Sequence, residues 1–131
     1  MSARDNSAIR ILVVDDVEEI RDSIEKLLQS DGYRVDSTRS EERAIESAQR
    51  MPPHLILVNL DGPAEEVIAA AHRIRHGARL GPRVPVVLLC AQAVDEGAEV
   101  EVGDNVYVTR PDNFDQLRAF MSRLLHRTCS T

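Results

Sequence analysis

The stretch that decides the fold is residues 9–16, IRILVVDD, a β-branched apolar run that stops at two adjacent aspartates. A short continuous run of this kind predicts a buried strand. Apolar side chains then recur at helical spacing until Asp31-Gly32 ends the pattern; they are Val17, Ile20, Ile24, Leu27 and Leu28. Residues 9–32 are therefore predicted to form a strand, a loop and an amphipathic helix.

The same unit repeats along the chain. Further strands are predicted at residues 33–38 (YRVDST), 55–60 (LILVNL), 84–91 (VPVVLLCA) and 105–111 (NVYVTRP). Ser40 and Asn113 are suited to cap helices that start just after them, and Pro52-Pro53 and Gly62-Pro63 punctuate the chain between elements. This alternation predicts an α/β fold with a five-stranded parallel sheet and helices on both faces.

Residues 92–104, QAVDEGAEVEVGD, interrupt the alternation. They contain an internal glycine and no clear helical apolar set, so a helix here is expected to be short or irregular. Val100 and Val102 alternate with Glu99 and Glu101, and therefore a strand-like path competes with that helix.

Length and composition limit the organisation and the partners. With 131 residues, of which 43% are hydrophobic and 29% charged, the chain is expected to be one domain over residues 1–131, with a core at about 9–127 and short polar termini. The net charge of −6 argues against nucleic-acid binding. No apolar run approaches the length of a membrane span or signal peptide, so a cytoplasmic location with reduced Cys90 and Cys129 is expected.

Five chemically distinctive residues lie at or near the ends of the predicted strands. Asp15 and Asp16 follow the first strand, Asn59 lies at the end of the third, Cys90 near the end of the fourth and Arg110 after the fifth. The carboxyl ends of parallel strands converge on one crevice, particularly where the strand order reverses. These residues therefore form the candidate functional site.

From about Ile9 to Arg127 the chain resembles a response-regulator receiver domain of two-component signalling. The motifs that carry the resemblance are ILVVDD, LILVNLDGP with its proline at position 63, and NVYVTRP, in which Tyr107 stands where the family often has a switch aromatic. The resemblance implies a doubly wound, flavodoxin-like sheet of order 2-1-3-4-5 with five helices. It also implies a phosphorylation site made of an acidic pair, an aspartate, a Thr or Ser and a Lys-Pro.

Three positions depart from that pattern. Asn59 replaces the phosphate-accepting aspartate, and a carboxamide is too poor a nucleophile to form an acyl phosphate. Cys90 replaces the hydroxyl residue and is expected to pack as a small hydrophobe. Arg110 replaces the lysine and is expected to neutralise Asp15 or Asp16 directly. Any Mg²⁺ site at Asp15 and Asp16 should be weak or vestigial, and no other cofactor is expected.

These departures favour a pseudo-receiver: a phosphorylation-independent signalling and protein-interaction module that is not an enzyme. One alternative is a phosphorylatable receiver in which Asn59 is an engineered substitution, or in which Asp61 accepts the phosphate. Another is a flavodoxin-like fold that binds a nucleotide or other anion, although no Gly-rich loop follows the first strand. Asp15 and Asp16 could also simply support the start of the first helix.

The charge pattern suggests where a protein partner binds. Residues 95–104 carry five acids and no base, whereas residues 72–83 carry four arginines and no acid. The resemblance implies that receivers often meet signalling partners through the region of residues 95–104, the fifth strand and the last helix. Opposite charges across such an interface speed and select association.

Overall fold

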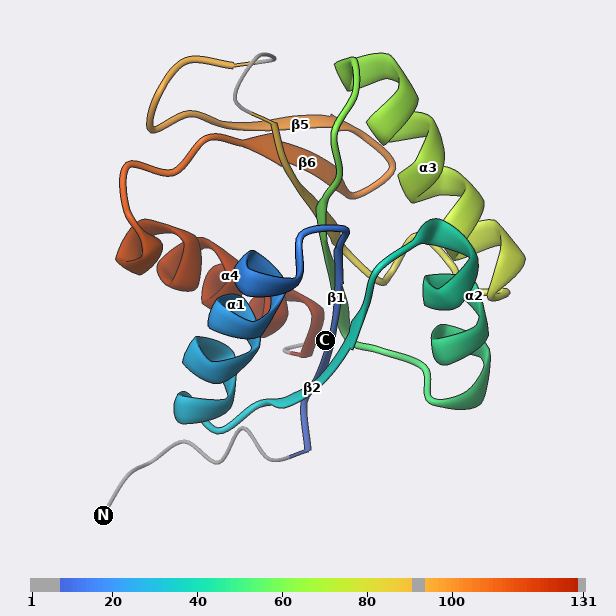
Figure 1. Cartoon of the computed structure of the whole chain (residues 1–131). Coiled ribbons are helices and arrows are strands. Elements are labelled where there is room, and N and C mark those ends of the chain that lie inside the picture. Colours follow the sequence, from blue (N-terminus) through green and yellow to red (C-terminus); the bar gives the residue numbers. More distant parts are fainter. Residues whose placement is uncertain (1–7, 91–93, 130–131) are drawn as a thin grey trace.

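The computed structural model describes residues 8–90 and 94–129. Six strands form one sheet in the order β2-β1-β3-β4-β6-β5, and Figure 1 shows α1 and α4 on one side of it and α2 and α3 on the other. The strands are β1 (Arg10–Asp15), β2 (Arg34–Thr38), β3 (Leu55–Asn59), β4 (Val86–Leu89), β5 (Glu99–Gly103) and β6 (Val106–Thr109). The helices are α1 (Glu18–Ser30), α2 (Glu41–Arg50), α3 (Ala64–Gly77) and α4 (Phe114–Cys129).

The predicted α/β fold is confirmed, and its strand order contains a switch point. β1 pairs in parallel with β2 on one side and with β3 on the other, and the sheet continues in parallel through β4 and β6. The chain therefore reverses its direction across the sheet between β1 and β3. At this switch point the strand ends Asp15 and Asn59 lie opposite each other in register.

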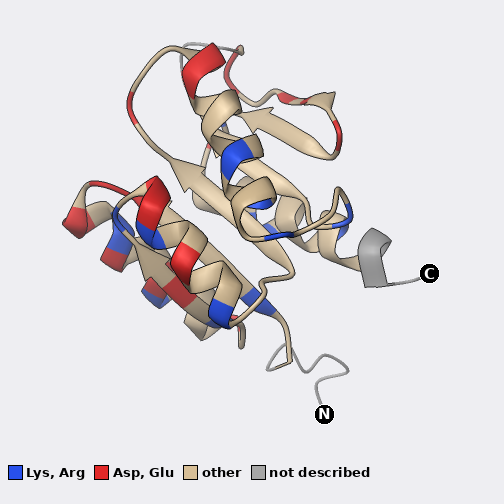
Figure 2. Cartoon of the chain, turned by 90° about the vertical axis from the view of Figure 1, so that its right-hand side faces the viewer, with Lys and Arg blue, Asp and Glu red and all other residues tan. Residues whose placement is uncertain are grey.

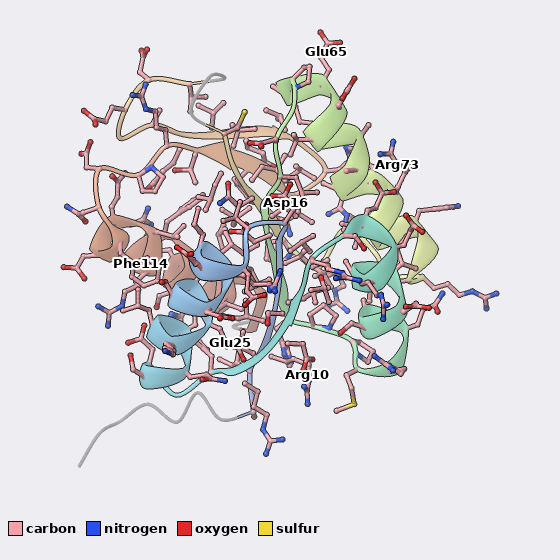
Figure 3. All side chains as sticks on the ribbon, in the orientation of Figure 1. Arg10, Asp16, Glu25, Glu65, Arg73 and Phe114 are labelled. Carbon is pink, nitrogen blue, oxygen red and sulfur yellow. The ribbon has the colours of Figure 1, made fainter. Side chains whose placement is uncertain are left out.

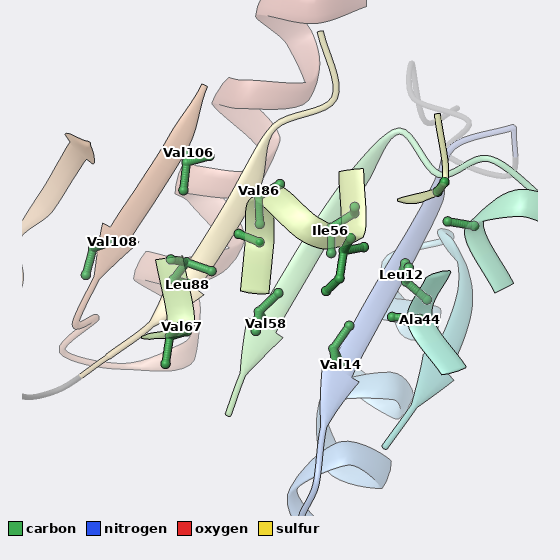
Figure 4. Packing of buried hydrophobic residues seen from close by; sticks show 14 residues of the cluster. Leu12, Val14, Ala44, Ile56, Val58, Val67, Val86, Leu88, Val106 and Val108 are labelled. Carbon is green, nitrogen blue, oxygen red and sulfur yellow. The ribbon is translucent and has the colours of Figure 1, made fainter. Parts of the chain in front are cut away.

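Two apolar layers cover the faces of the sheet. Successive residues of a strand point to opposite faces, so Leu12 and Val14 of β1 pack in the layer with α2 and α3, while Ile11 and Val13 pack in the layer with α1 and α4. Figure 4 shows the first layer. Burial on both sides explains why the central strands are continuously apolar.

The two predicted helix caps are confirmed. The Ser40 side chain accepts a hydrogen bond of 3.2 Å from the Arg43 N–H at the start of α2. The Asn113 side chain accepts one of 2.9 Å from the Gln116 N–H at the start of α4. Both bonds satisfy amides that have no partner within the helix.

The segment that interrupted the predicted alternation forms a strand. β5 pairs antiparallel with β6, which adds a sixth strand to the five predicted ones. The turn between them passes through Gly103, Asp104 and Asn105, with φ angles of 118°, 52° and 64°. Left-handed conformations of this kind suit Gly, Asp and Asn. In the part of residues 92–104 that the structure describes, 94–104, the strand-like alternative is thus the correct one; residues 92 and 93 lie outside it.

In the described part of the chain, no helix combines the length and apolarity that crossing a membrane requires.

Candidate functional site

The candidate site is built at the ends of β1 and β3. Asp15 is 0% exposed, and its Oδ2 accepts a hydrogen bond of 3.0 Å from Asn59 Nδ2. Its Oδ1 accepts a second bond, of 2.9 Å, from the backbone N–H of Val17. Both carboxylate oxygens of Asp15 therefore accept hydrogen bonds from protein donors, one of which is the Asn59 amide.

Arg21 is a member of this site that the sequence did not reveal. Its Nη1 donates a hydrogen bond of 2.9 Å to the backbone oxygen of Asp15. Arg21 lies one helical turn after Val17, and its backbone N–H also bonds the Val17 carbonyl. The only signal in the sequence was a basic residue in an otherwise acidic first turn. The carboxylate and the carbonyl of Asp15 are thus both tied to the start of α1.

Asp16 has a different environment. It is exposed and lies in the loop between β1 and α1, at the upper end of the sheet in Figure 3. Among the described residues, no three His, Cys, Asp or Glu side chains are arranged to hold a metal ion. Mg²⁺ prefers several oxygen ligands in octahedral geometry, and this site presents one buried, engaged carboxylate and one exposed one. The residues present therefore fit a magnesium site poorly.

Within the described residues, the Cys90 and Arg110 side chains make no hydrogen bond to Asp15 or Asn59. Cys90 is partly buried against the apolar layer under α2 and α3. Arg110 is exposed and makes no ion pair within the described residues, so the expected bond to Asp15 or Asp16 is not formed. Its backbone is instead held by the hairpin, because its N–H donates to Ala98 and its carbonyl accepts from Gly97. The sequence correctly predicted that Arg110 follows a strand, but it did not predict where the Arg110 side chain lies.

Tyr107 points into the core rather than toward solvent. It is 5% exposed, and its ring meets the Phe120 ring edge-on with centroids 5.5 Å apart and planes at 85°. The hydroxyl donates a 2.7 Å hydrogen bond to Asn105 Oδ1. In this inward position the ring packs against Phe120 and the hydroxyl has a hydrogen-bond partner. Asp61 is exposed in the loop after β3, beyond the strand end.

Residues 11–122 match the family model described as "Response regulator receiver domain", and the chain belongs to this family. Receiver domains of this family serve two-component signalling. The chain is 26% identical over 130 residues to the probable transcriptional regulatory protein TcrX of Mycobacterium tuberculosis (strain ATCC 25618 / H37Rv). That match covers 98% of this chain and 54% of TcrX, so the chain spans about half the length of that relative.

Two solved structures are also similar. One is the receiver domain of the sensor histidine kinase PA1611 of Pseudomonas aeruginosa PAO1, whose structure has a magnesium ion coordinated in the active site cleft. It matches with 29% identity and a TM-score of 0.64, over 94% of this chain and 98% of that one. The complex of histidine kinase ThkA with response regulator TrrA, Thermotoga maritima proteins, matches with 25% identity and a TM-score of 0.69, over 89% of this chain and 98% of that one.

Proposed function

We propose that this receiver domain works without aspartyl phosphorylation, as a cytoplasmic protein-interaction module rather than as an enzyme. The observation that carries the proposal is the 3.0 Å hydrogen bond from Asn59 Nδ2 to Asp15 Oδ2. It puts an amide where the family has its nucleophile, and it engages the buried acid of the pair. Asp15 and Asn59 therefore bind each other and hold the site in one conformation.

The neighbouring residues support this proposal. The Cys90 thiol is a weaker donor than the family's hydroxyl, and it packs against apolar side chains. The exposed Arg110 side chain makes no ion pair with Asp15 or Asp16 among the described residues. This geometry supports no more than the weak Mg²⁺ binding that the sequence predicts for Asp15 and Asp16.

Phosphorylation by a small donor tests the proposal. The protein and an Asn59→Asp variant are incubated with acetyl phosphate and Mg²⁺, and the intact masses are measured. We expect no phosphate-sized gain on the unmodified protein, because an amide does not form an acyl phosphate. A gain on the unmodified protein would contradict the proposal. An Asp61→Asn variant in the same assay then tells whether Asp61 is the acceptor, because the gain would disappear with that carboxylate.

We propose that the partner binds the hairpin of β5 and β6. β5 is the last strand in the sheet order, and Val100 and Val102 are each 43% exposed. Glu99 is held against α4 by hydrogen bonds from Arg123 and Gln116. The hairpin is thus anchored on one face and presents two valines on the other.

The charge of the hairpin favours a basic partner. Figure 2 shows acidic residues along this hairpin, at the upper right of the view. A strand edge exposes backbone groups that pair readily with another extended segment. Acids discourage a second acidic copy and favour a basic segment. The acids are Asp95, Glu96, Glu99, Glu101 and Asp104.

A paired substitution tests the hairpin surface. A Val100→Ser/Val102→Ser variant should capture about tenfold less of the partner that the unmodified domain captures, since each buried valine contributes roughly 1 kcal/mol or less. Quantitative mass spectrometry of affinity captures from cell lysate measures this loss. Met51, which is 48% exposed at the opposite end of the domain, supplies the control Met51→Ser. Equal losses in both variants would remove the hairpin as the binding surface.

A further inference from the structure

A recess lies at the β2 edge of the sheet, away from the switch point between β1 and β3. It is an open cavity of about 860 Å³ between α1, the end of β2 and α2. Figure 1 shows that β2 forms this edge, with α1 and α2 on either side of it. Four arginines line the cavity from all three segments: Arg21 from α1, Arg39 from the end of β2, and Arg43 and Arg50 from α2. Small-molecule sites commonly have volumes of about 300–1,000 Å³.

Three of these guanidinium groups are available to a ligand. Within the described part of the chain, Arg39, Arg43 and Arg50 are exposed, and their side chains form no ion pair or hydrogen bond. Several arginines elsewhere in the domain differ in this respect, although the exposed Arg110 also makes no ion pair within the described residues. Four of them are each paired with a carboxylate: Arg10, Arg73, Arg118 and Arg123.

The acids near the cavity do not neutralise it. Asp22 and Glu46 also line it, so four guanidinium groups face two carboxylates and leave two positive charges, in a chain whose net charge is −6. Glu41, at the start of α2, is committed elsewhere. Its oxygens accept hydrogen bonds of 2.7 and 2.8 Å from Arg73, and these bonds hold the pKa of Glu41 below its ordinary value.

The spacing of the arginines indicates the shape of the ligand. Arg43 and Arg50 are seven residues apart on one helix, which corresponds to about 10 Å along its axis. A chain of phosphates is long enough to contact both along the cavity. Guanidinium groups bind phosphate oxygens by paired hydrogen bonds. Ser37 and Thr38 add hydroxyls to the lining, and none of the described residues that line the cavity is aromatic.

We propose that this cavity binds a nucleoside triphosphate through its phosphate chain, with Arg39, Arg43 and Arg50 as the principal contacts. The base is not read, because no aromatic side chain is present to stack on it. Arg21 links the cavity to the strand-end site, since it lines the cavity and also bonds the carbonyl of Asp15. The proposal does not depend on whether Asn59 blocks phosphorylation.

Isothermal titration calorimetry tests the proposal in low salt with EDTA. ATP, GTP and inorganic tripolyphosphate should each bind saturably at one site, with affinities that agree within about threefold, and adenosine should not bind. An Arg43→Gln/Arg50→Gln variant should bind ATP about tenfold more weakly or worse, because two charge-assisted contacts are lost. Glutamine is a good helix former, so α2 should persist, and circular dichroism checks this.

The matched control removes two exposed arginines from outside the cavity. An Arg79→Gln/Arg83→Gln variant lowers the net charge equally and should leave ATP affinity within about twofold. Equal losses in the two variants would mean diffuse attraction and overturn the proposal. So would the absence of saturable ATP binding to the unmodified protein. An affinity for ATP more than threefold above that for tripolyphosphate would contradict recognition through the phosphate chain alone.

Discussion

An Asn59→Asp variant should have a free energy of unfolding about 2–4 kcal/mol lower than that of the unmodified protein at neutral pH without Mg²⁺. The substitution removes the Nδ2 donor that lies 3.0 Å from Asp15 Oδ2 and puts a carboxylate oxygen in its place. Asp15 is fully buried and residue 59 is only partly exposed, so water screens the two like charges weakly. Repulsion between two carboxylates would replace the hydrogen bond between Asn59 and Asp15.

Urea unfolding followed by circular dichroism, with and without Mg²⁺, measures this effect. Added Mg²⁺ should recover part of the loss in the variant, because two adjacent carboxylates plus Asp16 are a better ligand set for the ion. The unmodified protein should respond little. An Asn59→Ala variant loses the donor without adding a charge and should lie between the two. Equal stability of the Asn59→Asp variant and the unmodified protein without Mg²⁺ would contradict the role given to the Asn59–Asp15 bond.

The two acids of the pair should differ sharply in their effect on stability. Asp15→Ala should lower the free energy of unfolding by about 3 kcal/mol, because a fully buried side chain is removed and the partly buried Val17 N–H and Asn59 amide both lose their acceptor. Asp16→Ala removes an exposed side chain and should change stability by about 0.5 kcal/mol or less. Thermal or urea unfolding of the two alanine variants makes the comparison.

A double-mutant cycle isolates the central bond. Combining Asp15→Ala with Asn59→Ala should reveal a coupling energy of about 1–2 kcal/mol, as expected for a hydrogen bond to a charged group. Additive losses would mean that the two side chains do not interact in solution. Equal losses for the two aspartate variants would contradict the burial of Asp15.

The parallel framework was predictable from local patterns. The runs at residues 9–14, 55–60 and 84–91 are apolar at successive positions, and such strands can be stable only when both faces are covered. Apolar residues at helical spacing predicted α1, and Ser40 and Asn113 predicted the starts of α2 and α4. These signals are local because each depends on the spacing or the capping chemistry of neighbouring residues.

The path of residues 94–104 could not be decided in this way. Their alternating valines and glutamates are compatible with a strand, but an isolated strand gains nothing until it meets a partner. The partner is β6, and the contacts that hold β5 to it and to α4 come from Thr109, Arg123 and Gln116. A contact between distant segments selected the strand over a short helix.

The candidate site also has some features that the sequence predicts and others that only the tertiary structure decides. Chain order placed Asp15, Asn59, Cys90 and Arg110 near strand ends, and the family resemblance predicted that Asn59 stands at the phosphoacceptor position. The partner of each side chain depends on distances between residues far apart in the chain. Asp15 and Asn59 are 44 positions apart yet bond directly, whereas the Arg110 side chain makes no ion pair in the described part of the domain. The arginine cavity spans α1, β2 and α2, so folding alone brings its charges together.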